Sequence, residues 1–343
     1  MRIGIRSYGH YRDHLEGQGG VDLRNTVHYA HFLRSEGHDV RFFNEAQGID
    51  GVDVVLDAPR ENCANICATN HIHSFFFPFS RYSLEIPSVM SNPCYHRGQF
   101  MLSSPYRHGY NMAKSQLSDF KYKHLLFLPL PYPDDLCPAN LSPGFQRDTI
   151  FWGNKGNFAP EFGQENRYDL ITNGLNTLKA LVRLNNRADF RVVFVLDSLI
   201  RSTRREWRSE VESLISQLKN VERLEQVTWS EYVEIMSRTK INTHIGGLTS
   251  GINECLFTQS VPAVPEKFIF FQDVAEELKI LPPAEVATAD EIYEAYERLW
   301  FDERYYLHIH DAFQDVFVDH RTEGLRKYWQ KAMEELKDDV RRT

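Results

Sequence analysis

The sequence predicts an α/β protein made of two Rossmann-like, doubly wound domains that face a cleft. Its 343 residues are enough for two domains of ordinary size. Strand and helix patterns alternate through the first half of the chain, and the same alternation starts again near residue 148. Between the halves, residues 129–147 contain five prolines. Proline fixes φ and removes a backbone donor, so this stretch predicts an extended connection.

The first half opens with a βαβ pattern. Residues 2–7 alternate as a strand does, apolar positions from Leu23 to Leu33 recur at helical spacing, and Gly37 supplies a helix stop. A parallel sheet with a right-handed crossover is therefore expected. The other strands expected in this half are residues 39–43, 52–56, 74–77, 88–90 and 125–128.

The second half repeats this alternation. Residues 190–196 (FRVVFVL) form an almost unbroken apolar run, which is typical of a strand buried on both faces. Ser230 is expected to cap a helix that runs through Lys240. The remaining expected elements are a strand at 149–152, helices over 170–185 and 207–218, a strand at 241–245, a helix from near Ile252, and helices from Asp290 to the end. The predicted domains are 1–147 for the acceptor, 148–300 for a nucleotide-sugar donor, and 301–343 as helices that cross back to the first domain.

Composition narrows the class of protein. The formal net charge of −8 disfavours a protein whose main role is to coat nucleic acid, although residues 81–124 are locally basic and could line a groove for a polyanion. The five cysteines show no zinc-type spacing, so reduced thiols are expected. Neither a signal peptide nor an apolar run of membrane-spanning length is present in the sequence, which favours a cytoplasmic, soluble protein.

The strongest motif lies at residues 244–265, where a strand pattern runs into a loop of glycines and hydroxyls that opens a helix. Glycines allow backbone N–H groups to approach an anion, and a helix N-terminus favours negative charge. We therefore expect this loop to bind a diphosphate, and Glu254 to accept hydrogen bonds from a ribose. An ordinary βαβ turn with a solvated Glu254 is the alternative. The candidate donor-binding residues of this motif are His244, Gly246, Gly247, Thr249, Ser250, Gly251 and Glu254.

This motif, with the segment Ser260–Val264 (SVPAV) after it, resembles the donor site of GT-B glycosyltransferases. The resemblance implies a nucleotide diphosphate-sugar as co-substrate, with UDP-sugars favoured, and a reaction that needs no metal and no other cofactor. Many retaining members carry a second glutamate eight residues before the ribose-binding one, and Gly246 stands there in this chain. The stereochemical outcome therefore stays open.

Two further segments resemble the same family. Gly19 and Gly20, followed by a helix pattern and Glu36–Val40, are similar to the opening of GT-B enzymes, where a glycine pair contacts the donor diphosphate. The loop after residue 152 implies donor contacts by Gly153, Lys155 and Arg167, since cations form strong hydrogen bonds with phosphate. The glycines could instead form a turn, and the two cations could be solvated surface charges. Within the family, the second half is most similar to the phage DNA β-glucosyltransferase group.

An inverting transferase needs a base that deprotonates the acceptor. Ligands of doubly wound sheets bind at the carboxyl ends of the strands, so Asp13 and His10, which follow the first strand, are the candidate catalytic residues. The acceptor is open among a small molecule, a glycan and a modified DNA base. A GT-B-type epimerase and a non-catalytic sugar-nucleotide-binding protein are the alternative functions.

Overall fold

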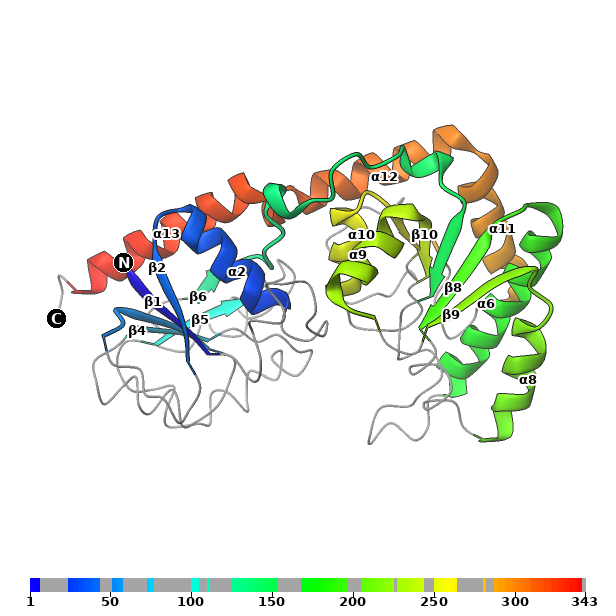
Figure 1. The fold of residues 1–343 in the computed structure, drawn as a ribbon, viewed down its shortest axis with the longest axis horizontal. Helices are drawn as coiled ribbons and strands as arrows, with labels where there is room; N and C mark the ends of the chain where they lie inside the picture. Colours follow the sequence, from blue (N-terminus) through cyan, green and yellow to red (C-terminus); the bar gives the residue numbers. More distant parts are fainter. Residues whose placement is uncertain are drawn as a thin grey trace. The chain divides into compact units, whose positions relative to one another are not determined.

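A computed structural model shows that the chain divides into two compact units. Unit 1 comprises Met1–Leu136 and Val318–Thr343, and unit 2 comprises Cys137–Phe317 (Figure 1). The structure describes residues 1–6, 24–43, 51–57, 73–76, 100–104, 110, 125–152, 168–195, 205–224, 227–243, 250–263, 280–281 and 287–340. No helix within these ranges is both long enough and apolar enough to cross a membrane.

Unit 1 contains a parallel sheet of six strands in the order β2-β1-β3-β4-β5-β6. Because β2 and β3 lie on opposite sides of β1, the sheet changes direction between β1 and β3. Of the expected strands, 88–90 lies outside the described residues, and β5 was not predicted. The strands are β1 (Arg2–Arg6), β2 (Asp39–Phe43), β3 (Val54–Asp57), β4 (His73–Phe76), β5 (Phe100–Ser104) and β6 (Leu125–Phe127).

Helix α2 (Arg24–Ser35) makes the crossover from β1 to β2. It ends as the sequence predicts, because Gly37 adopts a φ of 82°, where a side chain would be strained. The N–H of Gly37 donates to the carbonyl of Arg34 at 3.0 Å, and that of His38 to the carbonyl of Leu33 at 3.0 Å. The chain enters β2 directly after this helix end.

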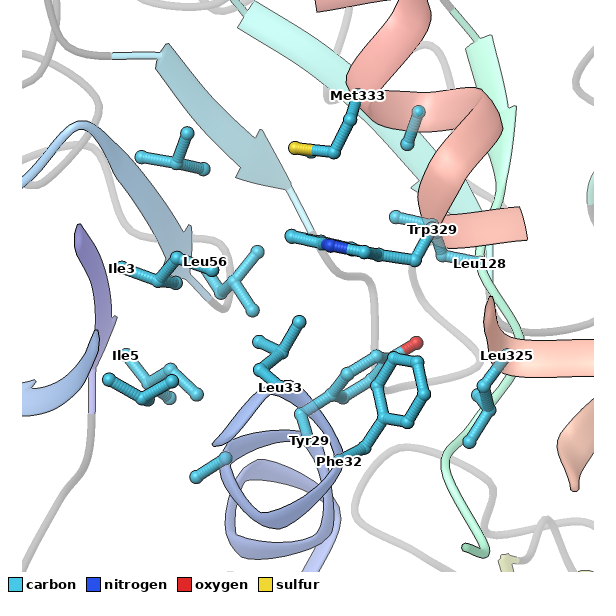
Figure 2. Close-up of a cluster of buried hydrophobic side chains, with 14 of the residues drawn as sticks. Ile3, Ile5, Tyr29, Phe32, Leu33, Leu56, Leu128, Leu325, Trp329 and Met333 are labelled. Carbon is cyan, nitrogen blue, oxygen red and sulfur yellow. The ribbon is translucent and has the colours of Figure 1, made fainter. Parts of the chain in front are cut away.

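The core of unit 1 is completed by α13 (Thr322–Val340), the last helix of the chain. Trp329, Leu325 and Met333 are buried against residues of β1, β3 and α2, as Figure 2 shows. A short 3-10 turn, η9 (Val318–His320), precedes this helix. The core of unit 1 is therefore assembled from both ends of the sequence.

The proline-rich segment, which the sequence predicts to be an extended connection, is partly buried. Leu128, Leu130 and Tyr132 are buried, and the N–H of Tyr132 donates to the carbonyl of His320 at 2.9 Å. His28 of α2 bonds the carbonyl of Pro131 at 3.0 Å. The segment is therefore packed between α2 and η9, and it includes the 3-10 turns η4 (Asp134–Leu136) and η5 (Gly144–Gln146).

Unit 2 contains a second parallel sheet, in the order β11-β10-β7-β8-β9. Edge strand β9 was not predicted. The two parallel sheets confirm the α/β class and the two Rossmann-like domains. The strands are β7 (Thr149–Trp152), β8 (Arg191–Val195), β9 (Asn220–Leu224), β10 (Thr239–Thr243) and β11 (Val261–Ala263); the helices are α6 (Tyr168–Arg187), α8 (Arg205–Ile215), α9 (Trp229–Arg238), α10 (Ser250–Phe257), α11 (Ala289–Phe301) and α12 (Glu303–Phe317).

The residue that caps α9 corrects the sequence interpretation. Thr228, not Ser230, caps α9, because its hydroxyl accepts from the N–H of Glu231 while the Glu231 carboxylate accepts from the N–H of Thr228. Along the chain, unit 2 begins at Cys137 and includes α12, and the residues from Val318 onward belong to unit 1.

Candidate functional site

The second sheet changes direction between β7 and β10. From β7 the chain adds β8 and β9 on one side, and it then returns through α9 to place β10 on the other side of β7. Asn242 of β10 pairs with Phe151 of β7, so the carboxyl ends of these two strands are neighbours. In open α/β sheets, ligands bind at this position. The predicted donor segments, 153–167 and 244–254, leave the sheet from these two strands.

Helix α10 starts seven residues after β10 ends and carries Glu254. Ser250 and Glu254 are four residues apart, which places them on the same face of the helix. The first N–H groups of any helix have no acceptor within the helix, and the helix dipole adds a partial positive charge there. The start of α10 therefore offers donors for an anion one turn away from a carboxylate.

Glu254 is buried, with only 2% of its surface exposed. The solvated glutamate of an ordinary βαβ turn is thereby excluded. Its neighbour Cys255 packs against Phe151, Tyr232 and Met236, which fixes the helix on β7 and α9. Burial, and next the Glu254 carboxylate, raise the pKa of the Cys255 thiol well above its usual value, so this cysteine is a packing residue.

Polar side chains stabilise the carboxyl end of β10. The hydroxyl of Tyr296 in α11 donates to the hydroxyl of Thr243, the last residue of the strand, at 2.8 Å. Asn242, which is 1% exposed, donates from Nδ2 to the sulfur of Met236 at 3.3 Å. Both contacts hold the point from which the predicted phosphate loop departs. The sequence does not identify Asn242 or Tyr296 as site residues, because the partner of each lies on a different element.

Glu254 is the one predicted site residue whose side chain the structure describes. Ser250 and Gly251, which the sequence assigns to the loop, are the first two residues of α10, two residues before the expected helix start near Ile252. The roles of these three residues toward a ligand stay predictions, as does the metal-independent reaction. The other predicted site residues lie outside the described ranges: His10, Asp13, Gly19, Gly20, Gly153, Lys155, Arg167, His244, Gly246, Gly247 and Thr249.

Solved structures with this fold include glycosyltransferases and an epimerase. A glycosyltransferase from Rickettsia africae is 12% identical over 100% of this chain and 99% of its own, with a TM-score of 0.60. An alpha-glucosyltransferase in complex with UDP and a DNA that contains an HMU base is 9% identical over 98% of this chain and 99% of its own, with a TM-score of 0.58. The UDP-GlcNAc 2-epimerase from Neisseria meningitidis, bound to UDP-GlcNAc, is 11% identical over 90% of this chain and 94% of its own, with a TM-score of 0.52.

These similarities confirm that the fold is GT-B, as the sequence motifs predict. The DNA-bound structure supports the resemblance to DNA glucosyltransferases, although it is an alpha-glucosyltransferase and the sequence indicated the β group. No protein-family model matches the chain, and no curated protein matches it.

Proposed function

We propose that the chain transfers a sugar from a UDP-sugar to an acceptor hydroxyl. The observation that carries the proposal is the buried carboxylate of Glu254, on a helix that begins beside the direction change of the second sheet. A helix N-terminus suits a diphosphate, and a carboxylate one turn later suits the two hydroxyls of a ribose. The UDP held by several proteins of similar fold supports this choice of nucleotide.

In this proposal, unit 2 binds the donor and unit 1 supplies the base. The leaving diphosphate is neutralised by Lys155, Arg167 and the loop that precedes α10. These groups take the place of a metal ion. Asp13 or His10, which follow β1, accepts the proton of the acceptor hydroxyl. The sugar forms its new bond to the acceptor oxygen while its bond to the diphosphate breaks.

The donor site is tested by calorimetric titration of UDP, ADP and GDP. Wild type is expected to bind UDP selectively. Glu254→Gln keeps the shape of the side chain but removes its charge, and we expect it to weaken UDP binding about ten- to a hundredfold, since two charge-assisted hydrogen bonds are lost. Glu234→Gln, on the exposed side of α9, is the matched control and is expected to bind as wild type. Equal affinity of Glu254→Gln and wild type would show that Glu254 does not read the ribose.

The reaction is tested by incubating UDP-glucose and UDP-N-acetylglucosamine with candidate acceptors. A DNA duplex with a hydroxymethylated pyrimidine is the first acceptor to use, because one protein of this fold was solved with a modified DNA base. A hexose mass added to the acceptor supports transfer. Because epimerases share the fold, proton NMR of the UDP-sugar without acceptor is the companion measurement. A changed sugar configuration would replace the transferase with an epimerase, and a donor that binds but never reacts would favour a binding protein.

A further inference from the structure

The C-terminal end of α10, together with Thr258 directly after it, accepts hydrogen bonds from three side chains that are distant in the sequence. Gln314 donates from Nε2 to the carbonyl of Leu256 at 2.9 Å, and the thiol of Cys137 donates to the carbonyl of Phe257 at 3.2 Å. Arg147 donates from Nη1 to the carbonyl of Thr258 at 2.8 Å. The last carbonyls of a helix have no partner within it, so these side chains supply donors at a buried helix end. The carbonyl of Leu256 also accepts from the N–H of Gln259 at 3.1 Å.

A continuous set of bonds joins these contacts to Glu254. The backbone N–H of Thr258 donates to the carbonyl of Glu254 at 3.0 Å, and the Thr258 hydroxyl donates to the same carbonyl at 3.0 Å. Arg147 therefore contacts the residue that is itself bonded twice to Glu254. The same guanidinium also donates to the carbonyl of Thr239, the first residue of β10, at 3.1 Å. Arg147 thus links the end of α10 to the start of β10 and fixes the position of the helix relative to this strand.

The three side chains come from the two places where the chain passes between the units. Cys137 is the first residue of unit 2, and Arg147 lies in the segment that begins there. Gln314 lies in the last turn of α12, which ends at Phe317, the last residue of unit 2. The segments by which the chain enters and leaves unit 2 are therefore both bonded to the helix that carries Glu254.

We propose that Gln314, Cys137 and Arg147 are positioning residues for Glu254, and that they couple nucleoside diphosphate binding to the conformation of these entering and leaving segments. The inference rests on the proposed function, since it takes Glu254 as the ribose ligand. A buried helix held at one end moves as a rigid piece, so displacement of its last turn displaces the carboxylate. Coupling of this kind is reciprocal: the segments alter the affinity for UDP, and UDP alters the segments.

The test uses Gln314→Met, which keeps the volume of the side chain and removes its donor. Gln217→Met is the matched control, because Gln217 makes the same kind of bond from Nε2, to the carbonyl of Ser213 at 3.0 Å, at the end of α8. Gln314→Lys restores a donor. We expect Gln314→Met to weaken UDP binding by about threefold or more, Gln217→Met to leave it unchanged, and Gln314→Lys to recover it.

A second readout follows the reverse direction of the coupling. The rate of alkylation of Cys137, resolved from the other cysteines by peptide mass spectrometry, is measured with and without UDP. We expect UDP to slow the reaction at least twofold in wild type, and less in Gln314→Met. Thermal unfolding midpoints of Gln314→Met and Gln217→Met are compared, because a structural role alone would lower the midpoint without changing UDP affinity.

The outcomes separate this inference from the proposed function. If wild type binds no UDP, the proposed function fails. If wild type binds UDP while Gln314→Met binds it equally well and Cys137 reacts at the same rate with and without UDP, the coupling is wrong and the donor site stands.

Discussion

Lys240 is a buried lysine whose charge the fold disfavours. It is 3% exposed, and its Nζ lies 3.7 Å from the ring centre of Phe145 and 4.4 Å from that of Trp300. Its ammonium donates a hydrogen bond to the carbonyl of Trp300 at 2.8 Å. Burial lowers the pKa of Lys240 from 10.5 to about 8, even though Glu303 favours the charged form. Desolvation therefore outweighs the rings and the negative charge.

The shift predicts a dependence of stability on pH with a definite sign. A lysine whose pKa falls on folding binds its proton more weakly in the folded state than in the unfolded chain. Its cost to stability is complete below pH 8 and is relieved as the pH rises toward 10.5. The difference in pKa corresponds to about 3 kcal/mol. We expect the free energy of unfolding of wild type to rise by about this amount, relative to Lys240→Met, between pH 7 and pH 10.5.

The assay is urea unfolding followed by tryptophan fluorescence at pH 7, 8, 9 and 10.5. Four of the five tryptophans belong to the range of unit 2, where Lys240 lies, so the signal reports the relevant unit. Other groups that titrate in this range are common to both proteins and cancel in the comparison. Lys179→Met, at an exposed lysine of α6, is the control and is expected to show no such trend. A difference between wild type and Lys240→Met that stays constant with pH would refute the reasoning.

Three further predictions concern packing and hydrogen bonds. Arg147→Met is expected to lower the free energy of unfolding by about 1–3 kcal/mol in urea titrations, because buried carbonyls lose a charged donor; unchanged stability would contradict this. The indole of Trp329 can only donate, and it donates to Nε2 of His38 at 3.1 Å, so His38 must be neutral. Since burial lowers the pKa of His38, unit 1 is expected to lose stability as the pH falls below 6.5, and His38→Gln is expected to flatten this part of a fluorescence-monitored acid titration. Gly324→Ala is expected to destabilise unit 1 by about 1–3 kcal/mol in thermal unfolding, because its Cβ would lie 2.5 Å from the carbonyl oxygen of Asp319; unchanged or raised stability would contradict the packing.

The sequence predicts those parts of the fold that depend on a few neighbouring residues. The apolar run at β8 and the glycine stop after α2 were predicted from neighbouring residues alone, and both are confirmed. Strand β9 was missed because it lies at the sheet edge with Glu222 and Arg223 on it, so its hydrophobic alternation is weak. The burial of residues 128–132 was missed because the side chains that cover it come from α2 and η9.

The same distinction between local and long-range signals applies to the site. A helix that opens on a loop of glycines and hydroxyls and carries Glu254 is a local motif, and the sequence predicts it. The bonds at the far end of its helix come from residues more than fifty positions away, Arg147 and Gln314. No pattern within a short window contains that information, because those contacts exist only once the sheet has assembled.

The placement of α13 has a consequence for how the protein is made. Leu128 leaves the ribosome about 200 residues before Trp329, which at about 5–20 residues per second corresponds to about 10–40 s. During that interval the apolar faces of Tyr29, Phe32 and Leu128 lack the helix that buries them in the finished protein. This apolar surface of the nascent first unit therefore stays uncovered until the whole of the second unit has been translated, and we expect the yield of folded protein to depend on translation speed and temperature.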